Sequence, residues 1–326
     1  MEAPTTESSP ARTDEAPTAL ELIRRPLSPS RAKDYLQCPK LFWYKTIEGR
    51  RTLPTTATAR GNLAHTALEH LFDHEPAERT AEVATAYIEP AWRVMTEPCV
   101  SKVGVDMASP EAAIRSSGAL WLEDLEGDPV RAANLDRSAR EHRNLAAAGS
   151  AEEQMLLSDA TKAVQNYFTF ANPQAVEAVG RELHVEAVVD DVALHGFIDR
   201  VDRHVSADGT ERVAIIDYKT GKPPRPAYEN DAFFAMEVYA LVLTEQSGRR
   251  PDTLRLLYLS QTTRERGVLT RPVTERSLET TRVKIRRLHA EIVESATHDV
   301  WETRKQRLCD WCDFQSECPA WSHAPA

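Results

Sequence analysis

Four of the five cysteines are spaced so that they can hold an inorganic group. Three lie near the C-terminus, as Cys309-x2-Cys312-x5-Cys318, and Cys38 lies near the N-terminus. Four thiolates bind Zn²⁺ tetrahedrally or hold an iron–sulfur cluster, and chemistry alone leaves both open, with zinc as the first choice. The fifth cysteine, Cys99, stands apart and is expected to take no part. The spacing therefore predicts a cage that ties the two ends of the chain together.

A second group of residues predicts a site for a hard cation. Asp199 and Asp217 each fall near the end of an apolar stretch typical of a strand, so neighbouring strands can aim both carboxylates at one point. Their oxygens suit Mg²⁺ or Mn²⁺. Lys219 follows Asp217 by two residues and shares its face, because strand side chains alternate with a period of two. An ammonium there can orient a water molecule while the cation polarises a phosphoryl oxygen.

The elements that must position these residues follow from apolar periodicity. Ser28 as N-cap and Pro29 at the first helical position predict a helix that carries Cys38 near its end. Further helices are expected over residues 60–72, about 231–247 and about 274–297. Strands are expected over residues 184–189, 194–201, 212–219 and 254–259. Strands framed by helices predict an α/β fold around a central mixed sheet, with the cysteine-bearing ends outside it.

We expect a single folded domain over residues 26–322. Within it, residues 75–175 are mostly helical in composition and predict a helical insertion. The tip of this insertion, at residues 127–150, contains Gly, Pro and Asp and is expected to be poorly ordered. Residues 300–320 form the C-terminal cysteine segment. Residues 1–25 are expected to be a disordered tail, because they are polar and proline-rich and lack the pattern of a signal peptide.

Composition and charge narrow the class of protein. The 326 residues are 41% hydrophobic, and no apolar run approaches the roughly 18 residues of a membrane span, so no membrane partner is expected. Without a signal peptide, a cytoplasmic location is predicted, where thiols stay reduced. The net charge of −10 is uneven, since residues 24–51 carry eight Lys and Arg against two acids. Residues 249–307 carry fourteen against eight. Such basic stretches can bind phosphate even in an acidic protein.

The segments around the two aspartates resemble a nuclease family. The stretches GFIDRVDR, at 196–203, and VAIIDYKTGK, at 213–222, resemble motifs II and III of the PD-(D/E)XK nucleases in their RecB-type branch. The stretch at 60–69 resembles the motif I helix of that branch. The resemblance implies a restriction-endonuclease-like core, in which the metal ligands are His65, Asp199 and Asp217 and the catalytic lysine is Lys219. Secondary candidates inside or beside these motifs are Tyr218, Tyr239 and Glu69.

The cysteine pattern resembles the iron–sulfur subgroup of the same branch, which includes the AddB nuclease domain and CRISPR-associated exonucleases. This likeness covers roughly residues 27–320 and reverses the preference for zinc. It implies a [4Fe–4S] cluster, with Zn²⁺ as the lesser candidate, bound by a set of four ligands: Cys38, Cys309, Cys312 and Cys318. The cluster would act as a clasp that joins the N- and C-terminal segments.

The resemblance implies a Mg²⁺- or Mn²⁺-dependent DNA exonuclease that acts on single-stranded or frayed ends in repair and recombination. Candidate partners are DNA, bound without sequence preference, and a helicase or other repair protein. No Walker A sequence occurs, so the chain carries no helicase motor of that type. One position departs from the family pattern, because alignment on Tyr239 puts Ala235 where a glutamine is usual. The alternative is therefore a catalytically weak module that binds DNA or a repair partner and keeps the cluster as a structural element.

Overall fold

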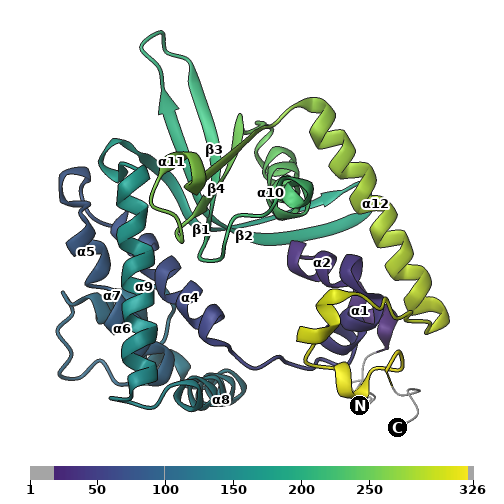
Figure 1. The fold of residues 1–326 in the computed structure, drawn as a ribbon, viewed down its shortest axis with the longest axis horizontal. Coiled ribbons are helices and arrows are strands. Elements are labelled where there is room, and N and C mark those ends of the chain that lie inside the picture. The colour runs from purple at the N-terminus through teal and green to yellow at the C-terminus, as the bar shows by residue number, and fades with distance from the viewer. Residues whose placement is uncertain (1–17, 99, 322–326) are drawn as a thin grey trace, which may run out of the picture.

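The computed structural model describes residues 18–98 and 100–321. Five strands form one sheet at the centre of the molecule, with helices on both sides (Figure 1). The strands lie in chain order, β3 and β4 are parallel, and the other neighbours are antiparallel. Their bounds are β1 (Glu177–Val189), β2 (Val192–Val205), β3 (Glu211–Lys219), β4 (Thr253–Tyr258) and β5 (Val268–Pro272). The predicted α/β fold around a mixed central sheet is confirmed.

The hairpin of β1 and β2 fixes which residues face each other near the predicted metal site. Its turn begins at Asp190, whose φ of 50° is a left-handed conformation that Asp tolerates in turns. Leu183 lies opposite Ile198, and Arg181 lies opposite Arg200. Glu182 and Asp199 lie between these two pairs and therefore across from each other.

Alternate residues of β3 enter two different hydrophobic cores. Ile215 packs into the core on one side of the sheet, and Ile216 and Tyr218 pack into the core on the other. The first side is covered by α2 (Pro29–Gln37), α10 (Glu229–Ser247) and α12 (Glu275–His298). Helix α10 also supplies the crossover between the parallel strands β3 and β4, which a tight turn cannot make.

The second side of the sheet is covered by helices from the segment between residues 56 and 170. They are α4 (Thr56–Leu71), α5 (Ala81–Thr85), α6 (Ile88–Thr96), α7 (Pro110–Ser117), α8 (Pro129–Leu145) and α9 (Ala151–Phe170). In Figure 1 they form a lobe beside the sheet. Among the described residues, no helix has the length and apolar character needed to cross a bilayer.

Helix α8 corrects the expectation of a poorly ordered tip at residues 127–150. The Asp128 side chain accepts a hydrogen bond from the Arg131 backbone N–H, and Pro129 takes the first helical position. Asp before Pro is typical of a loop but equally typical of a helix start. The prediction was wrong because these two residues were interpreted as loop formers.

Two strands also differ from the sequence-based expectation. Strand β1 begins at Glu177, seven residues before its predicted start. Gly180 and the charged residues Arg181 and Glu182 interrupt the apolar alternation there, and pairing with β2 extends the strand. Strand β5 was not predicted and pairs with β4 at the sheet edge. It follows the four-residue helix α11 (Arg264–Gly267).

The N-terminal region contains one predicted helix start and one unexpected helix. The Ser28 side chain accepts a hydrogen bond from the backbone of Arg31, and Pro29 opens α2, as predicted. Helix α1 (Ala19–Ile23), inside the segment expected to be a disordered tail, begins with a capping box and buries Ile23 in the core. Residues 1–17 of that segment lie outside the described residues, as does Cys99.

The two ends of the chain lie side by side, as the purple and yellow segments of Figure 1 show. Helix α2 ends at Gln37, Cys38 links it to α3 (Pro39–Phe42), and a π-helical turn, η1 (Trp43–Ile47), follows. The C-terminal segment packs here as two short 3₁₀ turns, η6 (Arg307–Trp311) and η7 (Gln315–Glu317). This arrangement brings cysteines from both ends of the sequence together outside the sheet, as predicted.

Candidate active site and cysteine cage

Asp199 and Asp217 meet where β2 and β3 leave their paired region. The last pair of these strands is Arg200 opposite Ile216, so the two aspartates follow directly on either side. Oδ2 of Asp199 accepts a hydrogen bond of 2.7 Å from the Tyr218 backbone N–H. That bond fixes the Asp199 carboxylate beside Asp217 and leaves its other oxygen available.

Lys219 points back toward Asp217 on the same face of β3. Its Nζ lies 2.6 Å from Oδ2 of Asp217, whose residue is only 8% exposed. Apart from this ion pair, the buried oxygen has no hydrogen-bond partner among the described residues. A buried carboxylate oxygen with spare acceptor capacity can take a cation.

His65, on α4, reaches the same point from the helical lobe. Its Nε2 lies 2.9 Å from the Tyr218 carbonyl oxygen, and its Nδ1 lies 3.4 Å from Oδ2 of Asp199. Because a carbonyl only accepts, Nε2 must carry the proton, and in the neutral ring Nδ1 then presents a lone pair to Asp199. Two acceptors that face each other need a proton or a cation between them. A backbone carbonyl on the second ring nitrogen is also the usual partner of a metal-binding histidine.

Glu182 completes this cluster and was not among the predicted site residues. One ligand atom each from His65, Glu182 and Asp199 lie within 4.8 Å of one another. Glu182 has a φ of 40°, an uncommon left-handed conformation for a non-glycine residue inside a strand. The signal that could have found it is the register, because a hairpin turn at Asp190 places Glu182 opposite Asp199.

Crowded, partly buried carboxylates shift each other's pKa. Burial, followed by the charges of Asp199 and Glu69, raises the pKa of Glu182 to about 7. Burial raises the pKa of Asp199 to about 6, with His65 acting in the opposite direction and Asp217 in the same one. The ionised forms of these carboxyl groups are therefore destabilised by burial and by mutual repulsion. The donor set of hard oxygens and one imidazole fits a divalent cation such as Mg²⁺ or Mn²⁺.

The three secondary candidates take different positions. Tyr218 serves through its backbone, since its N–H and carbonyl bond Asp199 and His65 while its side chain enters the core. The pKa of Tyr239, on α10, rises to about 12 through burial and then the nearby charge of Asp217. Glu69 lies one helical turn beyond His65, and burial raises its pKa.

A buried arginine supports the site from behind. The Arg200 guanidinium donates to both carboxylate oxygens of Asp202, at 2.7 and 3.0 Å, and to the hydroxyls of Tyr167 and Tyr218. It also lies over the ring of Phe72, 4.5 Å from its centroid. The charge is paired and hydrogen-bonded, as a buried ion requires. Arg200 thus anchors the residue whose backbone positions Asp199 and His65.

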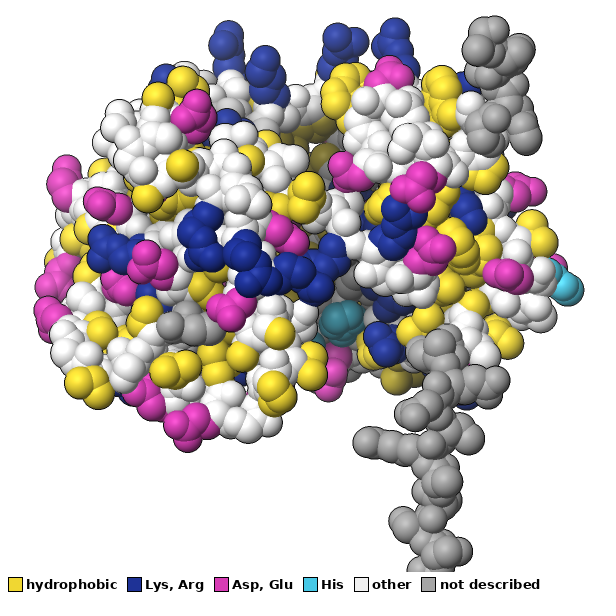
Figure 2. Space-filling view, turned by 90° about the horizontal axis from the view of Figure 1, so that it is seen from below, with side chains coloured by type: hydrophobic (Ala, Val, Ile, Leu, Met, Phe, Trp, Pro, Cys, Tyr) yellow, Lys and Arg dark blue, Asp and Glu magenta, His cyan; other side chains and the backbone are white. Residues whose placement is uncertain are grey.

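Positive side chains gather on one face of the molecule. Figure 2 shows a row of Lys and Arg side chains that crosses the face seen from below and leads to a hollow containing a histidine. Lys33, on α2, lies close enough to Lys219 and Asp217 to interact with their charges. Loss of hydration and then the charge of Lys219 lower the pKa of Lys33, while Asp217 acts in the opposite direction. Helix α2 therefore carries Lys33 near the carboxylate site and ends directly before Cys38.

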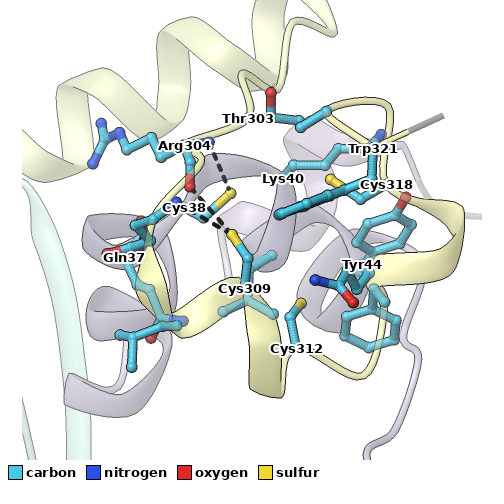
Figure 3. Close-up of a pocket in the computed structure, with 16 residues that line it drawn as sticks. Gln37, Cys38, Lys40, Tyr44, Thr303, Arg304, Cys309, Cys312, Cys318 and Trp321 are labelled. Atoms are coloured by element: carbon cyan, nitrogen blue, oxygen red, sulfur yellow. Dashed lines mark hydrogen bonds between the residues drawn. The ribbon is translucent and has the colours of Figure 1, made fainter. Parts of the chain in front are cut away.

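The four predicted cysteines line one pocket, with Cys38 from the α2–α3 junction and three from the C-terminal segment (Figure 3). All four are free thiols and partly exposed. Burial raises the pKa of Cys312, and charge on any of the other three would raise it further. Such mutual repulsion is relieved when thiolates share a metal, so this donor set fits zinc or an iron–sulfur cluster.

Backbone groups hold the sulfurs and the two chain ends in register. The Arg304 N–H donates to Sγ of Cys38 and the Gln306 N–H donates to Sγ of Cys309, both at 3.4 Å. The Arg304 side chain donates to the Leu36 carbonyl oxygen at 2.7 Å. N–H donors to sulfur stabilise thiolates and remain compatible with metal binding.

Aromatic and ionic contacts close the far side of the pocket. The Tyr44 ring stacks on Phe314, with centroids 4.7 Å apart, and the Tyr44 hydroxyl donates to the Glu317 carbonyl oxygen. Arg50 pairs with the Glu317 carboxylate through both of its terminal nitrogens, at 2.9 and 2.6 Å. The ends are therefore attached by protein contacts around the sulfurs as well as through them.

Comparison with known proteins identifies the family. The sequence matches the PD-(D/E)XK nuclease superfamily over residues 26–126 and 119–319. The chain belongs to this superfamily. Eighteen chains of solved structures also match. One is a putative exonuclease from Eubacterium rectale, with 10% sequence identity, a TM-score of 0.46, and coverage of 98% of this chain and 97% of that one. A search of curated proteins finds no match.

The superfamily assignment bears on the geometry above. The segments predicted to carry its motifs, around His65, Asp199 and Asp217, all fall inside the matched residues. His65 and Asp199 share the ligand cluster with Glu182, and Asp217 lies outside that cluster, across from Asp199 at the end of β3. Ala235 lies on α10, one turn before Tyr239, at the position where a glutamine was expected. The mixed sheet flanked by helices agrees with a restriction-endonuclease-like fold.

Proposed function

We propose that the protein is a metal-dependent deoxyribonuclease that hydrolyses phosphodiester bonds, acting as an exonuclease. The observation that carries this proposal is the convergence of His65, Asp199, Asp217 and Lys219 at the ends of β2 and β3 in a chain of the PD-(D/E)XK nuclease superfamily. The two carboxylates and the imidazole can donate electron pairs to a metal ion, and the Lys219 ammonium lies next to them.

The proposed roles follow from the contacts of each group. Asp199, Asp217 and His65 would hold Mg²⁺ or Mn²⁺, and Glu182 would add a fourth donor. A cation there supplies charge that polarises the phosphoryl oxygen. Lys219 lies beside Asp217 with its side chain 39% exposed, so its ammonium can orient the attacking water and stabilise charge on the phosphate. The Tyr218 carbonyl keeps His65 in the tautomer that leaves Nδ1 free.

The proposed substrate is DNA, bound through its backbone. Lys33 lies in the field of Asp217 and Lys219, and Figure 2 shows a row of basic side chains across one face of the molecule. Such side chains can neutralise phosphates without reading bases. Processing of ends in repair or recombination, with a helicase or another repair protein as partner, is the role we propose for such an activity. Binding should then be nearly independent of sequence and fall steeply with salt.

We further propose that the four cysteines hold a [4Fe–4S] cluster that clasps the chain ends. Protein purified without oxygen should be brown, absorb broadly near ~400 nm, and contain iron and sulfide. Cys38→Ala should remove this absorbance, whereas Cys99→Ala should keep it. Stoichiometric zinc without iron would overturn the cluster but keep a metal clasp.

The nuclease is tested with end-labelled single- and double-stranded DNA in the presence of Mg²⁺, Mn²⁺ or EDTA. We expect cleavage with either metal and none with EDTA. Lys219→Ala should lower the rate by about 10²-fold, the scale of one positioned catalytic group, while Lys222→Ala, on the exposed loop after β3, should not. Equal cleavage by wild type and Lys219→Ala would contradict the assignment of this site.

A second candidate function rests on Ala235. Without the usual amide, a contact to DNA or to a water molecule near the metal is lost, so the protein would bind DNA or a repair partner with weak catalysis. Ala235→Gln distinguishes the two: a gain of about 10-fold or more in cleavage, with unchanged DNA affinity, would favour the weak module. If wild type cleaves DNA and Ala235→Gln changes the cleavage rate little, the result would favour the nuclease.

A further inference from the structure

An exposed aromatic pair lies directly beside the carboxylate site. His184 on β1 lies opposite Phe197 on β2, two residues along each strand from Glu182 and Asp199. Two residues span roughly 7 Å of a strand, close to the spacing between successive nucleotides of an extended single strand. The rings of Phe197 and His184 are 5.0 Å apart between centroids and tilted by 45°.

The side of the sheet on which Phe197 lies is open. Gly196, its neighbour, faces α10, because a Cβ there would lie 2.4 Å from Cε1 of Tyr239. Ile198 is buried in the same core as α10. Strand residues alternate, so Phe197, which lies between Gly196 and Ile198, points away from α10. Phe197 is 53% exposed and His184 is exposed as well, although a Phe in a strand is usually buried.

Close packing behind this pair makes it rigid. Gly196 lets the Tyr239 ring approach the backbone of β2, and the hairpin register holds His184 against Phe197. His195 extends the same row, with its ring centroid 6.2 Å from that of His184. A rigid aromatic surface binds a flat ring with little loss of side-chain entropy.

We propose that Phe197 and His184 form a stacking platform for a nucleobase next to the scissile phosphate, so that the site selects an unpaired nucleotide. This rests on the proposed nuclease function and names its substrate class as a single strand or a frayed end. Stacking is tolerant of sequence because every base has a π-face, and it requires a base that is not covered by its own neighbours in a duplex. The platform lies beside the metal ligands and takes no part in holding the cation.

The test measures binding in the Asp217→Asn background, where cleavage does not interfere. Oligonucleotides carry 2-aminopurine at successive positions, and fluorescence reports stacking. We expect Phe197→Ala to weaken single-strand affinity by about 5- to 150-fold and to abolish quenching at one position, whereas Phe197→Trp retains both. Val188→Ala is the matched control, since Val188 is 67% exposed on β1, away from the site. Blunt duplex affinity should change less than single-strand affinity.

The outcomes separate the platform from the nuclease. An equal loss on single strands and blunt duplexes, or no loss on either, would overturn the platform even if wild type cleaves DNA normally. Position-specific quenching that depends on Phe197 would support the platform even if wild type cleaves no substrate. Thermal melting of each variant checks that the fold is intact, and hydrolysis of a small phosphodiester lacking a base should be insensitive to Phe197→Ala.

Discussion

The carboxylate site and the cysteine cage are built in opposite ways. The carboxylate site draws on α4, β1, β2 and β3, and its aspartates are buried or partly buried at the ends of paired strands. The cage draws on chain ends, short 3₁₀ turns and partly exposed thiols, and its contacts are mostly backbone hydrogen bonds. The carboxylate site is positioned by the fold, and its crowded carboxylates destabilise the metal-free protein. The cysteine cage instead holds in place the chain ends, which have little hydrophobic core of their own.

This difference separates two kinds of sensitivity. Changes at the carboxylates should alter chemistry and leave the structure nearly intact, while changes at the cage should loosen the structure and affect chemistry indirectly. Helix α2 links the two regions, because it contains Lys33 and is followed directly by Cys38.

The strongest test of this separation is Asp217→Asn. It removes a charge that the proposed cation needs, so cleavage should fall by about 10³-fold or more, since a bound cation supplies several kcal/mol to phosphoryl transfer. DNA affinity and melting temperature should stay close to wild type. Asp208→Asn, on the exposed β2–β3 turn, is the matched control and should cleave normally. A melting temperature that collapses with activity would show that the site is not separable from the fold.

Substitution of Arg200 should instead damage the fold behind the carboxylate site. Arg200→Met leaves Asp202 buried and unpaired and should lower the free energy of unfolding by about 3–5 kcal/mol, measured by urea denaturation. Arg203→Met breaks only a surface pair with Glu177 and should cost less than about 1 kcal/mol. Similar losses for both variants would contradict a special role for the buried network.

Loss of the cage should destabilise the ends more than the centre. Cys38 and Cys309 are 271 residues apart, so a shared metal group closes almost the whole chain into one loop. By analogy with covalent cross-links, Cys309→Ser should cost on the order of 2–4 kcal/mol and raise hydrogen exchange in α2 and residues 300–320. Exchange in β2 and β3 should change little. If hydrogen exchange rose in β3 before it rose in α2, the cage would stabilise the centre of the fold more than the ends, which would contradict the prediction.

The pH dependence of the metal-free protein should report the carboxylate site. The pKa values of Glu182 and Asp199, about 7 and about 6, lie above those of the unfolded chain, so between about pH 4 and 7 the folded state binds more protons. Proton binding by these two carboxyl groups therefore stabilises the folded state at acid pH. This stabilisation is lost as the pH rises to about 7, and the free energy of unfolding falls by up to about 1.4 kcal/mol per pH unit for each proton. Glu182→Gln should flatten this dependence. Added Mg²⁺ should raise the melting temperature more at pH 7.5 than at pH 5, and the reverse order would count against the site.

The smallest expected effect is at the contact between the two regions. Lys33→Ala should weaken DNA binding about 3- to 10-fold and reduce the salt dependence by about one phosphate contact, without changing the cage absorbance. Lys102→Ala, on the helical lobe and paired with Asp124, is the control. If Lys33→Ala has no effect in a Cys309→Ser background, then the cage acts on DNA binding through α2; an undiminished effect would show that the two are independent.

Local patterns were sufficient for much of this protein. The N-cap at Ser28, the alternation that marks β2 and β3, and the spacing of Asp217 and Lys219 depend on residues within a few positions of each other. The cysteine pattern predicted that the chain ends meet although Cys38 and Cys309 are far apart in sequence, because four thiolates that share one group must lie together. The other signals remain valid in the folded protein because the same short-range geometry that creates the pattern also defines the element.

Tertiary structure decided what depends on distant contacts. Glu182 joins the site only through the hairpin register and a left-handed backbone, Lys33 only through the packing of α2, and the His65 tautomer only through a carbonyl on β3. Strand β5 was missed for the same reason, because an edge strand looks like a loop until its partner is in place. The helix at residues 129–145 was missed for a local reason, since its Asp-Pro start was interpreted as a loop. The sequence by itself determined which groups could do chemistry, and the fold decided which of them face one another.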